Sequence, residues 1–225
     1  MHVVTLSFDD GFAHSSLRTG EIFERHGLVA ELNVLAAGFD GEPDDVWHDR
    51  WRKGDFGLWN ELKGRGHHVM PHGYRHANKA ELPLADAQRL IERCLDVFGA
   101  ELEGFDASKS SFAFPYNRST PALEAWLGRL VRAFRTGGDE SMPLPRPGQQ
   151  RVTCVSFGPE RCDDHLVRTV ESFLAGAPGW LCYNLHGLDD EGWGPVGSDT
   201  LDRLLERLVA RGVHVLPITA ALDLT

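Results

Sequence analysis

The sequence predicts an α/β fold: a distorted (β/α) barrel with seven or eight mostly parallel strands, formed as a single domain by residues 1–225. Two observations predict it. Apolar runs of strand length alternate along most of the chain with segments whose apolar residues follow helical spacing, a pattern typical of parallel strands joined by helical crossovers. The length of 225 residues is also close to that of single α/β barrels.

Each predicted strand is a short, mainly apolar run that ends in polar residues, glycine or proline. In chain order, the strands are expected over residues 2–8, 28–36, 67–71, 110–115, 130–136, 151–157, 180–185 and 213–219.

Helical spacing is clearest in residues 199–211, where five apolar residues from Leu201 to Val209 form one buried face. A second helix covers the apolar positions from Ala87 to Phe98 and is expected to end at Gly99, a common C-cap residue. The other helices are expected near 15–26, 55–64, 120–129 and 163–175. The segments 37–54 and 137–150, rich in Gly, Pro and charge, are expected to be long loops, because the alternation resumes after each.

Composition excludes several classes of function. The net charge of −10 disfavours a nucleic-acid ligand, which needs a basic surface, and no apolar run approaches the roughly 20 residues that cross a bilayer. The four cysteines have no C-x-x-C spacing, and the chain as given begins with a strand and carries no signal-peptide pattern. We therefore expect a cytoplasmic protein, whose oligomeric state the sequence leaves open.

Polar residues follow several of the predicted strands at the point where each strand ends. They are Asp9, Asp10, His72, His76, Tyr116, Asn117 and His186. Because the carboxyl ends of parallel barrel strands share one rim, where catalytic groups collect, we expect these side chains to lie close together.

Two histidines and an aspartate on this rim could bind a metal ion. His72 and His76 are four residues apart, so in a helical turn both imidazoles would project from one side. With Asp10 they would supply two nitrogens and one oxygen, which suits one divalent ion, first zinc and otherwise cobalt, nickel or manganese. Taken alone, Asp followed by Gly is also a common turn pair, and two histidines at this spacing can arise by chance. His14 is expected at the surface rather than as a fourth ligand.

Four short motifs follow one another along the chain: SFDDG at 7–11, HGYRH at 72–76, AFPY at 113–116 and LH at 185–186. They resemble the T-F-D-D-G, H-[ST]-x-x-H, R-x-P-Y and Leu-His motifs of the NodB-type polysaccharide deacetylases, carbohydrate esterase family 4. The resemblance covers nearly the whole chain. It implies a metal-dependent hydrolase of C–N amide bonds, with de-N-acetylation of an amino sugar in a glycan or glycan precursor as the expected reaction.

The resemblance also assigns roles to residues. Asp10 and the two histidines of HGYRH would hold the metal, and Asp9 would remove a proton from the attacking water. The backbone N–H of Tyr116, directed by Pro115, would stabilise the oxyanion. His186 would protonate the departing nitrogen.

Two parts of the family pattern are missing. Ala113 stands where the third motif has an arginine that orients the base, and Arg135 is a candidate replacement as well as a candidate substrate-binding residue. No clear D-x-x-D-W motif supplies a carboxylate partner for His186, for which Asp139 and Asp163 are candidates.

The substrate class stays open at this point. Trp193, seven residues after His186, is a candidate platform for a sugar ring, and Trp47 and Trp51 lie in or near loops as well. Gly73, at the variable hydroxyl position of the second motif, also fits allantoinase-like relatives, so hydrolysis of a small cyclic amide or imide is an alternative. A third possibility is a catalytically inactive sugar-binding relative.

Overall fold

The computed structural model describes residues 1–37 and 51–224. Within these residues, eight strands form one sheet. They are β1 (His2–Phe8), β2 (Glu31–Val34), β3 (His68–Pro71), β4 (Ser111–Ala113), β5 (Ala133–Gly137), β6 (Arg151–Ser156), β7 (Gly179–Leu185) and β8 (His214–Val215).

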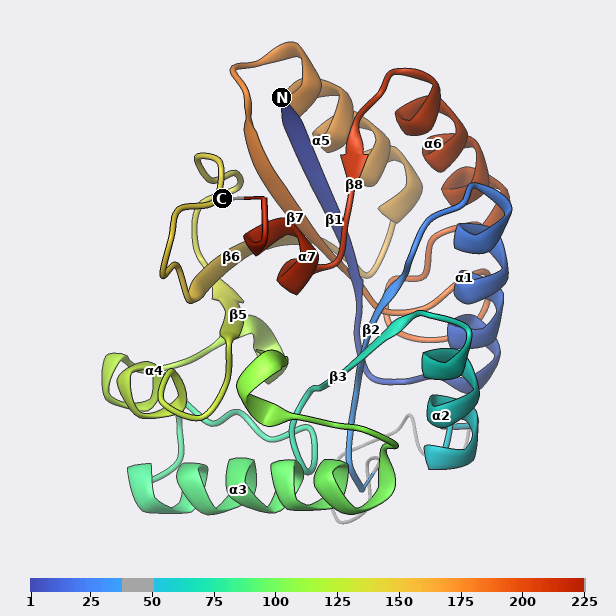
Figure 1. The fold of residues 1–225 in the computed structure, drawn as a ribbon. Helices are drawn as coiled ribbons and strands as arrows, with labels where there is room; N and C mark the ends of the chain where they lie inside the picture. Colours follow the sequence, from blue (N-terminus) through green and yellow to red (C-terminus); the bar gives the residue numbers. More distant parts are fainter. Residues whose placement is uncertain (38–50, 225) are drawn as a thin grey trace.

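The strands curve into a distorted barrel, as the sequence predicts (Figure 1). Their order is β3-β2-β1-β7-β6-β5-β4, and β8 pairs with the first half of β1. Every strand pair found in the described residues is parallel. The two strands at the ends of this order, β3 and β4, also lie side by side. The carboxyl ends of the strands therefore meet at one rim.

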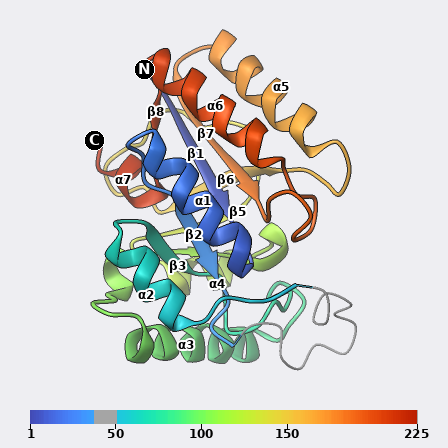
Figure 2. The same cartoon turned by 90° about the vertical axis from the view of Figure 1, so that its right-hand side faces the viewer.

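Helices cover the outer face of the strands (Figure 2). In the described residues they are α1 (Ala13–Arg25), α2 (Phe56–Gly64), α3 (Leu84–Glu101), α4 (Pro121–Leu127), α5 (Cys162–Ala175) and α6 (Ser198–Ala210). A further short helix, α7 (Ile218–Leu222), packs instead against the inner side of the barrel (Figure 1). Two short 3₁₀ helices, η1 (Ala107–Lys109) and η2 (Pro115–Asn117), flank β4.

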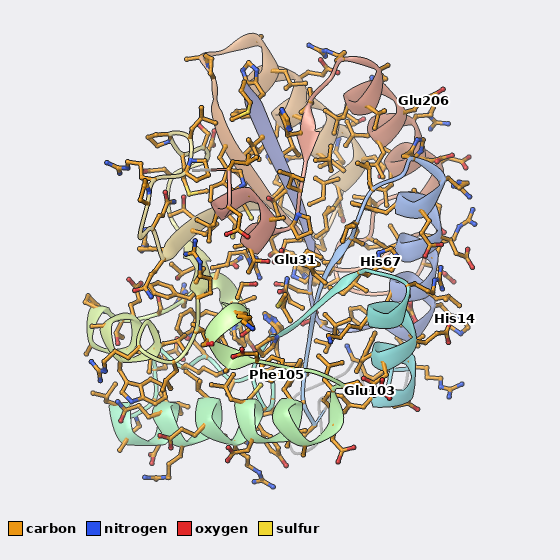
Figure 3. The ribbon with its side chains drawn as sticks, viewed as in Figure 1. His14, Glu31, His67, Glu103, Phe105 and Glu206 are labelled. Atoms are coloured by element: carbon orange, nitrogen blue, oxygen red, sulfur yellow. The ribbon has the colours of Figure 1, made fainter. Side chains whose placement is uncertain are left out.

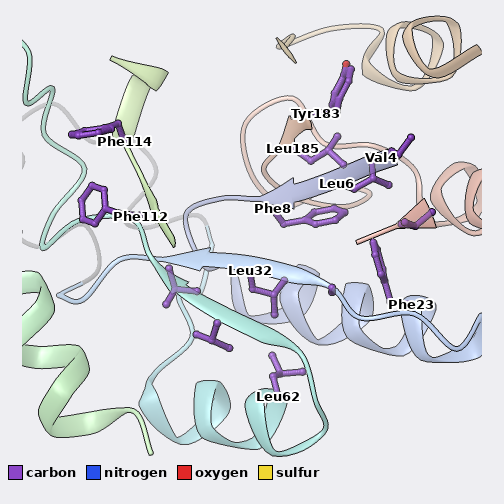
Figure 4. Packing of buried hydrophobic residues seen from close by; sticks show 14 of the residues in the cluster. Val4, Leu6, Phe8, Phe23, Leu32, Leu62, Phe112, Phe114, Tyr183 and Leu185 are labelled. Atoms are coloured by element: carbon purple, nitrogen blue, oxygen red, sulfur yellow. The ribbon is translucent and has the colours of Figure 1, made fainter. Parts of the chain in front are cut away.

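The two faces of strand β1 contact two different layers, the apolar core beneath the helices and the barrel interior. Its alternate residues Val4, Leu6 and Phe8 belong to the main apolar core beneath the helices, where the Phe8 ring meets Phe23 of α1 edge to face at 6.0 Å (Figure 4). The residues between them face the barrel interior, because side chains alternate across a strand. Thus the hydroxyl of Thr5 donates to the Leu216 carbonyl, at 2.7 Å.

The barrel interior is apolar at one end and polar at the other. Near the start of β1, a second apolar cluster joins Val3, Trp180 and Cys182 to residues of α7. Toward the end of β1 the inward positions become Ser7 and then Asp9, both buried. Polar side chains are therefore gathered inside the barrel below the rim.

The last predicted strand is mostly wrong. Only His214–Val215 is strand, and Ile218–Leu222 forms the helix α7. Pro217 has no N–H to donate to a sheet and stands at the N-cap of α7. The helix is held from inside the barrel, because the Glu31 carboxylate accepts a 2.5 Å hydrogen bond from the Ile218 N–H.

The predicted end of the third helix is also wrong. Helix α3 continues through Gly99 to Glu101 instead of ending at the glycine. The reason is the next residue, Leu102, which is buried in the core and whose N–H still donates to the Phe98 carbonyl. The apolar contact of Leu102 therefore extends the helix by two residues beyond Gly99.

Of the two predicted long loops, only the second lies fully within the described residues. Most of the predicted loop 37–54, including Trp47, lies outside the described residues. The loop 137–150 is present after β5, and its Met142 pairs with Trp180 by two backbone hydrogen bonds.

No helix in residues 1–37 or 51–224 is long and apolar enough to span a membrane. All four cysteines lie in the described residues, are buried and form no disulfide.

Glu31 is a buried acid in the middle of the barrel (Figure 3). Burial raises the pKa of its carboxyl to about 7, and the negative charge of Asp9 acts in the same direction. The Ile218 N–H and the charge of Arg135 oppose this shift. Because the pKa is about 7 in the folded chain and about 4.5 in the unfolded chain, the folded state binds this proton more tightly.

Glu31→Gln is expected to stabilise the fold at neutral and alkaline pH. The stabilising effect of the Glu31 proton is fully present below about pH 4.5 and is lost as the pH rises through about 7. The gain of the variant over the wild type in unfolding free energy should grow over this range to the order of 3 kcal/mol. Urea unfolding between pH 4 and 8 measures it, with Glu206→Gln at an exposed position of α6 as control. An equal difference in unfolding free energy between variant and wild type at both ends of this pH range would contradict the raised pKa of Glu31.

Candidate metal centre and active site

Three of the rim residues form a group able to hold a metal ion. One ligand atom each from Asp10, His72 and His76 lie within 4.8 Å of one another. The Nε2 atoms of both histidines are 3.5 Å from Oδ1 of Asp10. Two nitrogens and one carboxylate oxygen, facing a common point, are a donor set that suits zinc and related divalent ions.

The Asp10 side chain fits such an ion because one of its carboxylate oxygens has no hydrogen-bond donor within the described residues. Its Oδ1 is buried and accepts no hydrogen bond from any described residue. A buried carboxylate oxygen without a donor is costly unless a cation faces it. Burial by itself would raise the pKa of Asp10, but His76 and His72, together with Lys53, hold it well below its usual range. Asp10 is therefore ionised at neutral pH.

The backbone at the end of β1 explains the glycine of the first motif. Asp10 has a φ of 75° and Gly11 a φ of 76°, so the chain turns through two left-handed residues. A Cβ on Gly11 would lie 3.0 Å from the Trp59 ring and 3.1 Å from Val34. Only glycine combines this conformation with this packing. The Asp-Gly pair thus does form a turn, and the turn directs Asp10 toward the histidines.

His72 is oriented by the seam between β3 and β4. Its Nδ1–H donates to the carbonyl of Ala113, at 2.9 Å. Since a carbonyl can only accept, the proton of the neutral ring is on Nδ1 and the lone pair is on Nε2, which faces Asp10. His72 is almost completely buried. This single contact therefore fixes both the tautomer and the direction of the ring.

His76 reaches the site by a loop and not by a helix. The expectation of a helical turn over residues 72–76 is wrong, because the segment after β3 consists of irregular backbone and bends. Gly73, with a φ of 111°, reverses the chain and brings His76 back beside His72, with ring centroids 5.4 Å apart. Burial lowers the pKa of His76 to about 4, against the attraction of Asp10, so its ring is neutral at pH 7 and can donate a lone pair.

Asp9, the neighbour of Asp10, is held from two sides inside the barrel. Arg135 donates from Nη2 to Oδ2 at 2.5 Å, and the Asn33 amide donates to Oδ1 at 3.0 Å. Its Oδ2 lies 3.7 Å from Nε2 of His72. The carboxylate is thus fixed beside the three candidate ligands. Asp9 is not one of the three residues of the metal group.

The position of Arg135 corrects one part of its predicted role. Its side chain has 0% exposed surface, so it offers no face to a substrate. Its guanidinium donates hydrogen bonds to Asp9, Asn117 and Cys154. We therefore assign it to the orientation of Asp9 and withdraw it from the substrate-binding residues.

His186 and Trp193 lie together at the end of β7. Their rings meet edge to face, with centroids 5.0 Å apart. Burial lowers the pKa of His186, whereas the charges of Asp10 and Asp9 raise it, so His186 lies within electrostatic reach of both carboxylates. Trp193 is half-buried and packs on the backbone of Gly158, where a Cβ would lie 2.7 Å from the indole.

Neither candidate carboxylate partner of His186 is placed for that role. Asp163 accepts from the Gly197 N–H and the Thr200 hydroxyl near the start of α6. Asp139 uses its backbone carbonyl to accept from Thr153. No carboxylate in residues 1–37 or 51–224 forms a hydrogen bond with His186. Its ring instead packs against Trp193.

Pro115 and Tyr116 form a sharp turn after β4. Pro115 is buried at the first position of η2, and Tyr116 follows with a left-handed φ of 58°. The Tyr116 ring is 57% exposed and lies 4.5 Å from the ring of His76, centroid to centroid. This contact places the turn, and with it the Tyr116 N–H, beside the metal group.

Comparison with known proteins agrees with this architecture. No protein-family model matches the sequence, and no curated protein matches it. Solved structures do match. The Bc1960 peptidoglycan N-acetylglucosamine deacetylase aligns with a TM-score of 0.69 and 15% identity over 98% of this chain and 87% of its own. The chain has the fold of carbohydrate esterase family 4.

Two further structures with the family 4 fold differ in activity. The family 4 acetyl xylan esterase from Clostridium thermocellum, solved in complex with a cobalt ion, has a TM-score of 0.66 and 16% identity over 99% of this chain and 91% of its own. BA3943 from Bacillus anthracis is described as a family 4 pseudoenzyme, with a TM-score of 0.66 and 16% identity over 98% of this chain and 65% of its own. The family 4 fold alone therefore does not decide whether a chain is active.

The structure explains two departures from the motifs of family 4, Ala113 in the third motif and Gly73 in the second. Ala113 and Arg135 are directly paired residues of β4 and β5, so the arginine missing from one strand is supplied by its neighbour. At Gly73, a Cβ would lie 2.6 Å from the buried Nζ of Lys79 and 3.2 Å from the Arg75 carbonyl. Together with the positive φ, this packing requires glycine. Gly73 is therefore explained by the path of the loop.

Several residues around the site were not predicted. Asn33 donates to Asp9, the charge of Lys53 lowers the pKa of Asp10, and Asn184 accepts a hydrogen bond from Asn117, which the sequence did place on the rim. The signal for Asn33 was available, since a polar residue at an inward position of an apolar strand indicates a buried partner. His14, by contrast, is exposed on α1 as expected (Figure 3).

Removal of a ligand is expected to abolish metal binding without unfolding the chain. Asp10→Ala or His76→Ala should weaken the binding of Zn²⁺ or Co²⁺ by more than about 100-fold, beyond the 10–100-fold typical of outer-shell changes. Titration with Co²⁺, followed by its visible spectrum, and elemental analysis measure this. His14→Ala is the matched control and should bind like the wild type. A wild-type protein that takes up no divalent ion would contradict the assignment.

Proposed function

We propose that this protein is a metal-dependent amide hydrolase that removes the N-acetyl group from an amino sugar of a glycan or glycan precursor. The observation that carries this proposal is the pairing of Asp9 and Asp10. One carboxylate is held in place by Arg135, while the other presents a buried oxygen without a donor to two imidazole nitrogens. Base and ligand are thus separate groups on adjacent residues.

Asp10, His72 and His76 would hold a divalent cation, with zinc as the first choice. When bound, such an ion polarises the amide carbonyl and lowers the pKa of water from about 15.7 toward about 7. Asp9 takes the proton of the attacking water, and its contacts with Arg135 and Asn33 hold the carboxylate in a fixed direction.

Two other groups of the chain complete the reaction. The Tyr116 N–H, in the turn that packs on His76, donates to the developing oxyanion. His186 gives a proton to the nitrogen as the C–N bond breaks, which is needed because an amine anion is a very poor leaving group. Asp9 and Asp10 favour the protonated form of His186 at this step, against its burial. The products are acetate and a free amine.

A sugar substrate is supported by two aromatic side chains that pack against histidines of the site. Tyr116 lies on His76, and Trp193 lies on His186. Half-exposed aromatic rings stack on the apolar faces of sugars. The net charge of −10 also favours a neutral or cationic substrate over a polyanion.

The cyclic-amide alternative loses its support in the sequence. It rested on Gly73 and on the missing arginine of the third motif. The first follows from packing against Lys79, and the second is replaced by Arg135. The inactive alternative is disfavoured because the base, the three ligands and the acid are all present. Both alternatives are outcomes of the assay below.

Asp9→Asn is expected to lower kcat by about 10²- to 10⁴-fold, because the amide cannot accept the proton of water at neutral pH. Acetate release from N-acetylglucosamine oligomers measures this, with wild-type metal content as the control for the site. Ring opening of a small imide by the wild type, without acetate release, would favour the cyclic-amide alternative. Loss of neither activity in the variant would remove Asp9 as the base.

Trp193→Ala is expected to raise KM for the sugar by about 2- to 10-fold, as lost ring stacking of roughly 0.5–1.5 kcal/mol implies. Trp193→Phe should retain most of the affinity. Initial rates over a range of oligomer concentrations measure both. An alanine variant with unchanged KM and kcat would eliminate the sugar platform.

A further inference from the structure

A closed ring of hydrogen bonds joins the segments that carry the base, the oxyanion turn and the acid. Arg135 donates from Nη1 to Oδ1 of Asn117, at 2.9 Å, and from Nη2 to Asp9. The Asn117 amide donates to Oδ1 of Asn184 at 3.1 Å, and the Asn184 amide donates to the Leu185 carbonyl at 3.1 Å. That carbonyl also accepts from the Asp9 N–H at 2.8 Å, which closes the ring.

The chemistry of the groups fixes the direction of every bond in this ring. Arginine has no acceptor, so Asn117 must turn its oxygen toward Arg135 and its NH₂ toward Asn184. Asn184 must then accept with its oxygen and donate with its own NH₂ to Leu185. No member can rotate its amide without breaking two bonds.

Asn117 also holds an unfavourable backbone turn. Tyr116 and Asn117 are two consecutive non-glycine residues in the left-handed region, with φ of 58° and 52°, at a cost of order 1–3 kcal/mol each. The Asn117 N–H donates to the Phe114 carbonyl, and its own carbonyl accepts from the Thr136 hydroxyl at 3.2 Å. Gly137 allows this approach, since a Cβ there would lie 2.9 Å from the Asn117 oxygen.

We propose that Asn117 is a positioning residue that couples the base to the oxyanion turn. Through Arg135 it fixes the direction of the Asp9 carboxylate, and through its backbone it fixes the Tyr116 N–H. Through Asn184 it ties both to the end of β7, two residues before His186. This inference rests on the proposed function for its catalytic consequence, whereas the coupling itself is a property of the fold.

The test begins with Asn117→Gly, which removes the side chain but tolerates the left-handed backbone. We expect kcat for deacetylation to fall by about 10- to 100-fold, as small misplacements of reacting groups cause, with KM and metal content within twofold of the wild type. The matched control is Arg161→Gly, at another left-handed position (φ 58°), exposed at the start of α5. It should leave kcat unchanged. An Asn117→Gly enzyme with wild-type kcat would overturn the proposal.

A double-mutant cycle separates this role from general destabilisation. If the ring acts as a unit, Asn184→Ala should add little to the loss caused by Asn117→Gly, because the link is already broken. If the two losses in kcat multiply, the residues act independently and the proposal is wrong.

Hydrogen exchange tests the coupling without any activity. In Asn117→Gly, the amides of Arg118, which donates to the Pro115 carbonyl in the turn, and of Asp9 should exchange at least about 10-fold faster, while those of Val4 and Leu181 in the core should not change. Unchanged exchange at both Arg118 and Asp9 would overturn the coupling. A wild type without deacetylase activity would instead refute the proposed function. The exchange measurement would still show whether Asn117 couples the segments through the ring of hydrogen bonds.

Discussion

The ion pair between Asp9 and Arg135 is the interaction on which the candidate site depends. Both side chains are inside the barrel, and Arg135 has no exposed surface. Removing one partner of such a pair costs about 3–5 kcal/mol, because the other charge is left buried and unpaired. The pair therefore holds the carboxylate in one place. It also gives Asp9 a cation of its own, while Asp10 faces the two histidines.

This arrangement needs a barrel whose interior changes character from one end to the other. Near the amino end of β1 the interior is filled by Val3, Trp180 and the short helix α7, which exclude water. Toward the carboxyl end it holds Glu31, Arg135 and Asp9, each bonded to a neighbouring strand or helix. The apolar end stabilises the fold by burial, and the polar end, which has to satisfy its groups by hydrogen bonds, orients the rim.

The same rim shows how two neighbouring strands can direct a side chain to the same point. A guanidinium reaches Asp9 from β5, because Ala113 and Arg135 are neighbours across the β4–β5 pair. Neighbouring positions of parallel strands point to the same side of the sheet, so either can supply a long side chain to the same point. The small Ala113 leaves space for Arg135, and its carbonyl orients His72.

Much of this could be predicted from the sequence by itself. The alternation of apolar strands and amphipathic helices determined the barrel, because periodicity reports which face of each element is buried. The polar residues at strand ends determined which side chains would meet, because the carboxyl ends of parallel strands share a rim. Asp9, Asp10, His72, His76 and His186 follow from that rule.

Only the tertiary structure decided the contacts between segments distant in the chain. Periodicity reports nothing about a loop such as 72–76, whose path depends on Gly73 packing against Lys79. Periodicity also does not report that Leu102 extends α3 past Gly99. Nor does it report that the Glu31 carboxylate accepts from the first N–H of α7, a helix where a strand was expected. The orientation of Arg135, Asn117 and Asn184 likewise arises only after the strands pair. Hydrogen bonds between residues far apart in sequence leave no local pattern, because each partner is chosen by the fold.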